Sequence, residues 1–458
     1  MDFYQITLCV LVAANIAFLW AQHGKTGGLA KTWLSSSSAT RSFQLTFFLP
    51  YTVAVAADWL QGPHIYAIYK YEKALPEKTV AALYATGFAA GGLSASFAGS
   101  LADRFGRKRA CLLYCGLYAL ACLSMLSGDL PALFAGRVAG GVGTTLLFSV
   151  FEAWMISDYH RRGLGATTLA LDDYAKGVGE DEETAREGDL DREGYEDEGA
   201  AGSMSLDAVF GTMTTLSCIV AILSGVVGDT LVSISGTRQW PFIAAMVCSV
   251  VAACIISFTW RENHGLESDS DHNSSQVHTG SRFYFLRDPQ ILALGLTTCI
   301  FEGTAYLFIF FWSATLQNAR DTGSGTAASG ELPFGLIFSS FMCTMLAGSA
   351  MFSHLRAGSA STSNILLSIL VIVGGCLGFI VNVRDERVLF LVFCIIEGCI
   401  GAYFPAMASL KSQLVNDGIR GRVYSVLRAP LNVFVVVAHC LDEEGENMAT
   451  VSLKVLPH

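Results

Sequence analysis

The segment GSLADRFGRKR, residues 99–109, lies between two hydrophobic stretches, 79–101 and 109–127. Its glycines, Gly99 and Gly106, permit close helix packing and a tight turn. Asp103 can cap a helix or pair with a charge on a neighbouring one. The basic residues favour the cytoplasmic side of a membrane; they are Arg104, Arg107, Lys108 and Arg109. An ordinary basic loop needs only these, so the aspartate and both glycines indicate a more specific structural role.

The composition places the chain in a lipid bilayer. Of its 458 residues, 52% are hydrophobic and 15% are charged, and the mean hydropathy is +0.47. A helix needs about 20 mostly apolar residues to cross the hydrocarbon core. Such stretches lie at 2–21, 43–66, 79–101, 109–127, 130–157, 205–232, 240–260, 290–316, 333–353, 363–383, 387–410 and 422–441. The first lacks the charged region and cleavage site of a signal peptide, so we expect an anchoring helix.

The distribution of charge predicts the orientation and excludes several classes of protein. Lys and Arg are concentrated on the side that carries the 99–109 loop, which places both termini outside. The net charge of −10 comes mostly from the acidic segment 172–199, which we expect to be a solvated loop, so no nucleic-acid partner is expected. The chain has no phosphate-binding loop and no C-x-x-C pair. We therefore expect a transport process driven by a gradient, with no cofactor and no metal.

Charged residues within the hydrophobic stretches are the main candidates for function. Each costs about 2.5–3.5 kcal/mol at the centre of a membrane helix, so a functional or pairing role is expected. The candidates are Asp58, Arg137, Glu152, Glu302, Glu397 and Arg428.

Depth along the helices sorts these candidates. Asp58 and Arg137 both fall about 10–12 Å below the outer surface, so the two side chains can meet. Glu152 lies near the inner end of its helix, where pairing with a loop base such as Arg161 is favoured. Glu302 and Glu397 fall near the midplane. Arg428 lies in the inner half, next to Pro430. Either arginine can clamp a carboxylate or bind an oxyanion, which suits the guanidinium fork.

The stretch AADWLQGPHIYAIYKYE, residues 56–72, predicts an interrupted helix. Gly62 and Pro63 end or bend it, because proline lacks a backbone N–H. We expect the break to place Trp59 and Tyr66 at the membrane interface. We also expect it to turn Asp58 and Gln61 toward a central cavity.

A weak internal repeat accompanies the loop. GSAMFSHLR, residues 348–356, aligns with GSLADRFGR and keeps Gly-Ser and the terminal Arg but not the aspartate. Repeats of this kind are typical of secondary transporters.

The 99–109 loop resembles the G-x-x-x-D-R-x-G-R-K loop that joins helices 2 and 3 in the major facilitator superfamily. Further segments resemble its molybdate-anion transporter branch: DWLQGPHIYAIYKYE, LLFSVFEAWMISDYH (146–160), PFGLIFSSFMCTMLAGS (333–349), YFPAMASLK (403–411) and LRAPL (427–431). The resemblance implies an all-α integral membrane protein with the major facilitator fold of two six-helix bundles. It also implies an extra N-terminal helix before the fold. The last helix of the family fold has no matching hydrophobic stretch in this sequence.

The resemblance also assigns the parts of the chain. Residues 1–41 would hold the extra helix and a cytoplasmic linker, and residues 42–260 the N-terminal bundle with the acidic cytoplasmic loop 158–204. A cytoplasmic linker at 261–288 would precede the C-terminal bundle, 289–441, and a polar tail, 442–458.

Secondary active uptake of molybdate across the plasma membrane is the function that the resemblance implies, with a coupling ion such as H+. The candidates for substrate binding are Asp58, Gln61, Arg137, Glu302, Glu397 and Arg428. The gating or structural set is Gly99, Asp103, Arg104, Gly106, Arg107, Lys108 and Glu152. Two alternatives stay open. One is a porter for a small organic solute or sugar, with a cavity of aromatic and amide groups, and the other is a receptor or scaffold that does not transport. No enzymatic activity is expected.

Overall fold

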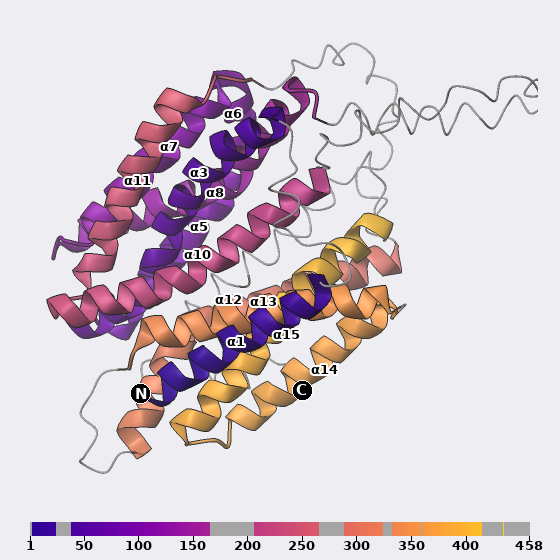
Figure 1. The fold of residues 1–458 in the computed structure, drawn as a ribbon. Helices are drawn as coiled ribbons and strands as arrows, with labels where there is room; N and C mark the ends of the chain where they lie inside the picture. The colour runs from indigo at the N-terminus through magenta and orange to yellow at the C-terminus, as the bar shows by residue number, and fades with distance from the viewer. Residues whose placement is uncertain are drawn as a thin grey trace, which may run out of the picture.

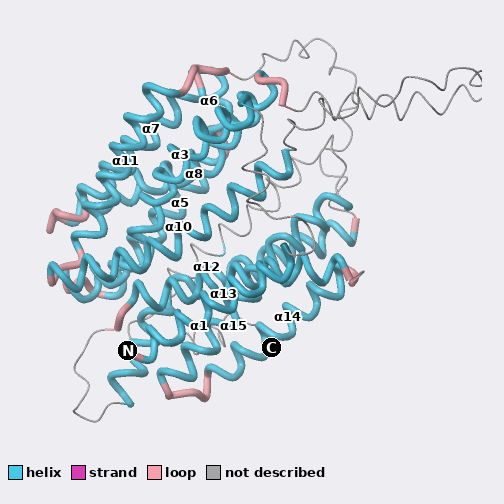
Figure 2. Tube along the Cα trace, in the orientation of Figure 1, coloured by secondary structure: helices cyan, strands magenta, loops and turns pink. Residues whose placement is uncertain are grey.

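The computed structural model describes residues 2–23, 38–164, 206–264, 288–323, 332–358, 360–414 and 434. These residues form helices joined by loops, with no strand among them (Figure 2). Seven of the described helices are long and apolar enough to cross a membrane, and a bent pair raises the number to eight. The prediction of an all-α membrane protein is confirmed.

The helices form two bundles that lie side by side (Figure 1). The N-terminal bundle contains α3 (Ser38–Gln61), α5 (Glu77–Ala95), α6 (Ala98–Phe105), α7 (Arg107–Ser124), α8 (Leu130–Arg161), α10 (Leu206–Ser235) and α11 (Gln239–Thr259). The C-terminal bundle contains α12 (Pro289–Gly323), α13 (Phe334–Ala357), α14 (Thr362–Ile380) and α15 (Glu386–Leu414). The closest packing pairs α5 and α7 with α8 in one bundle and α13 with α15 in the other, while α10 packs on α13 across the two.

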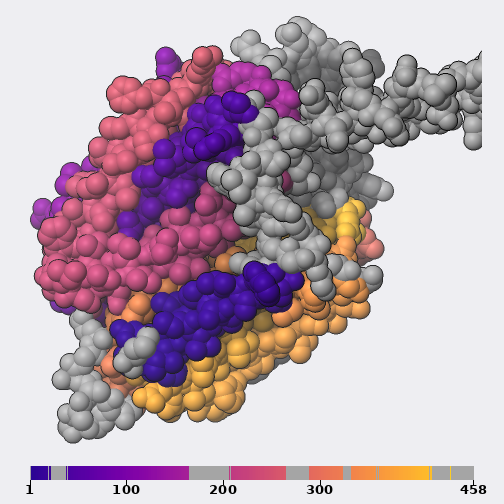
Figure 3. Space-filling view, in the orientation of Figure 1, coloured from indigo at the N-terminus to yellow at the C-terminus, as the bar shows by residue number. Residues whose placement is uncertain are grey.

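The first helix, α1 (Phe3–His23), belongs to the C-terminal side of the molecule. It packs against α13 and lies as an indigo rod on the orange surface of that bundle (Figure 3). The Asn15 side chain donates a hydrogen bond to the carbonyl of Cys343, 3.1 Å away, and the Tyr4 hydroxyl donates one to Glu386. A segment that precedes the first bundle in the sequence is thereby fixed to the second bundle.

The α-helix of α3 ends at Gln61, where the sequence predicted a break. A 3-10 turn (η1, Gly62–His64), a short α-helical turn (α4, Ile65–Ala67) and a π-helical turn (η2, Ile68–Glu72) follow. The α-helix is interrupted at Gly62 and Pro63, and the helical run extends beyond residue 66, the end that was expected.

The interface position expected of Trp59 and Tyr66 stays a prediction, and both side chains pack against other residues. Tyr66 is buried, donates a hydrogen bond to Glu77 at 2.7 Å and packs on the ring of Phe310. Trp59 donates to the Ser217 hydroxyl and packs on Phe338. Tyr66 is therefore packed inside the protein, and Trp59 is partly buried.

The expected span 79–101 is two helices. α5 and α6 meet at a 54° bend around Ser96 and Phe97. α6 then ends at Phe105, and Gly106 connects it to α7.

Candidate functional site

Aromatic rings join the two bundles at the end away from the 99–109 loop. The Tyr84 ring of α5 packs on Phe310 of α12 with centroids 4.7 Å apart, and Tyr66 contacts the same phenyl ring. Close by, the Ser339 hydroxyl of α13 donates to the carbonyl of Ile222 in α10 at 2.8 Å. These contacts close the junction between the bundles at the end predicted to be outside.

Arg137 lies next to this junction. Its guanidinium sits 5.0 Å from the centroid of the Tyr84 ring, and its Nε donates to the carbonyl of Leu83 at 3.3 Å. Gly87 leaves room for the guanidinium, because a Cβ atom at this position would lie 3.1 Å from it. No described carboxylate lies within ion-pair distance of Arg137. The group is therefore a half-buried cation without a counter-ion, beside the ring that touches the other bundle.

The structure does not bring Asp58 to Arg137. The Tyr118 hydroxyl donates to Asp58 and lies 2.7 Å from the hydroxyl of Thr144. Asp58 therefore faces α7 and α8 inside the N-terminal bundle, and the clamp between Asp58 and Arg137 is not formed. Gln61 is buried and donates to the carbonyl of Ala57 at 3.4 Å, within its own helix. Helix rotation, which sequence spacing did not fix, accounts for the different partner.

The C-terminal bundle holds a separate ion pair. Glu302 of α12 lies 3.7 Å from the ammonium of Lys411 and accepts a hydrogen bond from the Tyr403 hydroxyl. Glu397 of α15 is buried and makes no hydrogen bond or ion pair with the described residues. The remaining candidate, Arg428, lies outside the described residues. The described candidates for substrate binding are therefore distributed over both bundles, each in surroundings of its own.

The loop between α6 and α7 is a network of charges. Asp103 pairs with Arg107 at 2.7 Å, and Arg107 also donates to the carbonyl of Ala153 in α8. The backbone N–H of Lys108 donates to Glu262 at 2.8 Å, and its ammonium donates to carbonyls at the end of α11. The loop thereby ties α7 to α8 and to the segment after α11.

The two glycines of this loop behave differently. Gly106 has φ +108°, and a methyl group there would lie 2.5 Å from the carboxyl carbon of Glu262, so both the turn and the space require glycine. Nothing lies within 4 Å of the same point on Gly99, so close packing at Gly99 is not seen. Arg104 is exposed, with its guanidinium 5.6 Å from the ring of Phe105.

Glu152 is not paired with Arg161. Asp158, one helical turn before the arginine, accepts hydrogen bonds from Arg161 and from Arg162, the latter at 2.7 Å. The spacing of three and four residues on one helix is the signal that favours these pairs. The sequence analysis missed Asp158 because it gave weight to intramembrane charges. It missed Lys411 and Tyr118 because neither carries a local pattern that predicts its partner.

The comparisons agree with this architecture. Residues 8–178 and 192–388 match the profile of a family described as "Sugar-transporters, 12 TM". The nucleoside transporter NupG has a similar fold, with a TM-score of 0.64 at 11% identity over 90% of this chain and 95% of that one. The chain belongs to this family of membrane transporters, within the major facilitator superfamily.

Relatives with a recorded transport function are also found. The chain is 28% identical to a molybdate-anion transporter of Xenopus tropicalis over 95% of its own length and 88% of that protein. It is 26% identical to a molybdate-anion transporter of Danio rerio, over 87% of its length and 79% of that protein.

Proposed function

We propose that this protein is a secondary active transporter that takes up molybdate across the plasma membrane. The observation that carries the proposal is Arg137, a half-buried guanidinium beside the junction of the bundles that no described carboxylate neutralises. A buried cation without a counter-ion is costly, and a tetrahedral oxyanion entering between the bundles would provide the missing charge. The names of the relatives support molybdate as that oxyanion.

Transport without chemical conversion of the substrate is part of this proposal. Energy would come from an ion gradient, with H+ as the proposed coupling ion. Glu302 and Glu397 are carboxyl groups within the C-terminal bundle, and they are the groups proposed to bind and release the coupling proton.

The test is molybdate uptake into cells that lack their own molybdate transporter, with sulfate as competitor. Wild-type protein is expected to restore uptake. Arg137→Gln is expected to abolish it, and Arg137→Lys to retain the charge but bind more weakly, because an ammonium lacks the two-pronged fork. Lys78→Gln removes an exposed positive charge near the start of α5 and is the matched control. Wild-type uptake by Arg137→Gln at limiting molybdate would contradict the proposal, as would equal uptake with and without the wild-type protein.

A porter for a small organic solute or sugar is the second candidate. The aromatic rings at the junction, Trp59, Tyr66, Tyr84, Phe310 and Phe338, favour it, because stacking on rings is a common way to hold such solutes. Competition by sugars, with no effect of sulfate or of Arg137→Gln, would support this reading. A receptor or scaffold would take up neither kind of solute when reconstituted in liposomes.

A further inference from the structure

A basic pocket lies at the loop end of the N-terminal bundle, away from the junction described above. Its volume is about 500 Å³. Ser42 and Thr46 of α3 form one side of it, and Thr259 at the end of α11 another. The remaining polar lining is arginine: Arg161, Arg162 and Arg261. Its walls come from three different helix ends, so the pocket is part of the folded bundle and not of a single loop.

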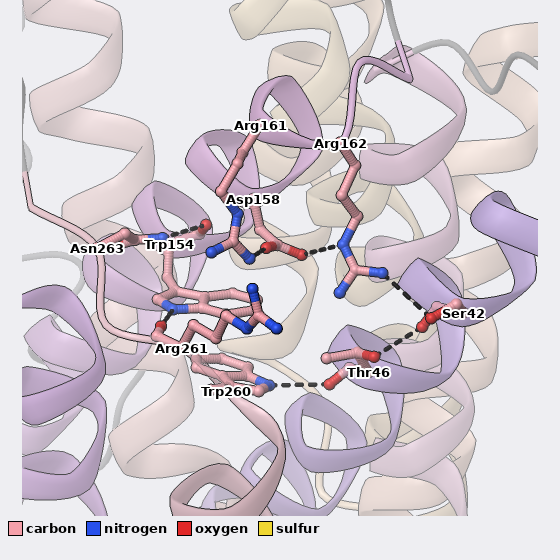
Figure 4. A network of polar contacts seen from close by, with 9 residues as sticks. All are labelled: Ser42, Thr46, Trp154, Asp158, Arg161, Arg162, Trp260, Arg261 and Asn263. Carbon is pink, nitrogen blue, oxygen red and sulfur yellow. Dashed lines mark hydrogen bonds and ion pairs between the residues drawn. The ribbon is translucent and has the colours of Figure 1, made fainter.

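The pocket carries an excess of positive charge. Asp158 is fully buried and accepts hydrogen bonds from both Arg161 and Arg162. The side chain of Arg261 makes no hydrogen bond or ion pair within the described parts of the chain. Figure 4 shows one carboxylate among three guanidinium groups. The three guanidinium groups and the one carboxylate therefore leave this network with a net charge of +2, and only Arg261 lacks a partner among the described residues.

A stacked pair of indoles fixes the backbone at the pocket. The indoles of Trp154 and Trp260 stack with centroids 3.7 Å apart. The Trp154 N–H donates to the carbonyl of Arg261 at 2.9 Å, and the Trp260 N–H donates to the carbonyl of Thr46 at 2.8 Å (Figure 4). The backbone of Arg261 and of Thr46 is thus fixed before any ligand arrives, which lowers the entropic cost of binding.

Exposed apolar side chains lie on the two helices that line this pocket. Ser42, Leu45 and Leu49 share one face of α3, and the two leucines are 57% and 54% exposed. On α11, Phe258 is 90% exposed and immediately precedes Thr259. In a membrane protein such apolar faces contact acyl chains, so the pocket lies where the headgroup of a neighbouring lipid would be.

We propose that this pocket binds the phosphate group of an anionic phospholipid, whose acyl chains lie along α3 and α11. Guanidinium groups bind phosphate oxygens with pairs of charge-assisted hydrogen bonds, and the hydroxyl of Ser42 adds a neutral donor. A free phosphate ion has the same oxygen chemistry but gains nothing from the apolar faces. The site is distinct from Arg137 and does not depend on the transported substrate.

The experiment measures lipid binding to the purified full-length protein in detergent by native mass spectrometry, with phosphatidic acid and phosphatidylcholine as probes. Phosphatidic acid is expected to bind more tightly than phosphatidylcholine. Arg261→Gln is expected to weaken phosphatidic acid binding about tenfold, because it removes charge-assisted hydrogen bonds to the phosphate. Arg261→Lys should fall between the two. Arg356→Gln removes an exposed arginine at the end of α13 and is the matched control, with unchanged binding expected.

Two further arms keep the result decisive. Ser42→Asp places a negative charge on the pocket wall beside Arg162 and should also weaken phosphatidic acid binding, which provides a second variant if Arg261→Gln unfolds. Millimolar inorganic phosphate should not displace the bound lipid. Equal binding of both lipids, or wild-type affinity in the folded pocket variants, would overturn the proposal. Displacement by inorganic phosphate would assign the pocket to a soluble anion and overturn the lipid as its ligand.

Discussion

Segments 99–107 and 348–356 are the two copies of the internal repeat, yet their backbones differ. In the first copy α6 ends at Phe105, and Gly106 turns the chain into α7. In the second copy α13 continues without interruption from Phe334 to Ala357. Leu355 stands at the position of Gly106, and the buried Phe352 at that of Asp103. The charged, turned loop is therefore a property of the N-terminal bundle and not of the repeat.

Close helix crossings, by contrast, occur in both bundles. In the N-terminal bundle α5 and α8 approach so closely that a methyl group on Gly141 would collide with the carbonyl of Gly87. In the C-terminal bundle a methyl group on Gly348 of α13 would collide with the carbonyl of Gly398 in α15. Small residues at such crossings are typical of membrane helices. A close glycine crossing of two helices is thus common to both bundles, although Gly99, the counterpart of Gly348, has open space around it.

The largest effect is expected from breaking the close helix crossings that both bundles contain. Gly141→Val and Gly348→Val each force a side chain into the backbone of the facing helix, and we expect each to cost about 3 kcal/mol or more, since overpacking alone costs about 1–3 kcal/mol. Thermal unfolding in detergent, followed by tryptophan fluorescence, measures the loss. Gly140→Val and Gly374→Val are the controls, because Gly140 has only Ala121 at 3.7 Å and Gly374 has nothing within 4 Å. A control as unstable as its partner would show that glycine content, and not the crossing, matters.

The next effect tests what the copies do not share. Gly106→Ala places an alanine at φ +108° against Glu262, and backbone strain of this kind costs about 1–3 kcal/mol. We expect a lower melting temperature and slower uptake. Gly99→Ala, in α6 of the same loop, has open space around it and should be neutral or slightly stabilising, since alanine is favoured over glycine within a helix. Equal effects at the two glycines would contradict the role assigned to the turn.

The sequence predicted the helices far better than it predicted their partners. Hydrophobic stretches and the positive-inside pattern depend on local composition, so the helices and the turn at Gly106 were predictable. The partner of Asp58 depends on how α3 is rotated against α7, which is a property of the packed bundle. The same holds for Lys411. From the sequence alone it is a basic residue at a helix end, and only the packing of α12 against α15 brings it to Glu302. Charges within one helical turn, such as Asp158 and Arg161, lie between these limits, because their spacing alone brings them together.

A smaller effect separates Asp58 from Arg137. Asp58→Asn keeps an oxygen that accepts the Tyr118 hydrogen bond, so we expect a loss of about 1 kcal/mol in unfolding free energy. Because Asp58 and Arg137 have different partners, the double variant Asp58→Asn with Arg137→Gln should show a coupling energy below about 0.5 kcal/mol. Thermal unfolding of the four proteins of this cycle gives that value. Rescue of stability in the double variant would mean that the two residues form the clamp that the sequence predicted.

The smallest effect on stability is expected at Asp103, the residue that the second copy replaces with Phe352. The Asp103 side chain is 46% exposed and its ion pair with Arg107 is partly open to solvent, so Asp103→Asn should change the unfolding free energy by about 1 kcal/mol or less. We expect transport to slow nevertheless, because Arg107 also holds the carbonyl of Ala153, and the ion pair biases how α6, α7 and α8 pack in the two states of the transport cycle. The measurement pairs the maximal uptake rate with the amount of protein in the membrane. Glu386→Gln is a matched control, since it neutralises a carboxylate near an arginine at the opposite end of the C-terminal bundle. An unchanged maximal rate in Asp103→Asn would show that the charged loop stabilises the N-terminal bundle without gating it, and the difference between the two copies would then be structural alone.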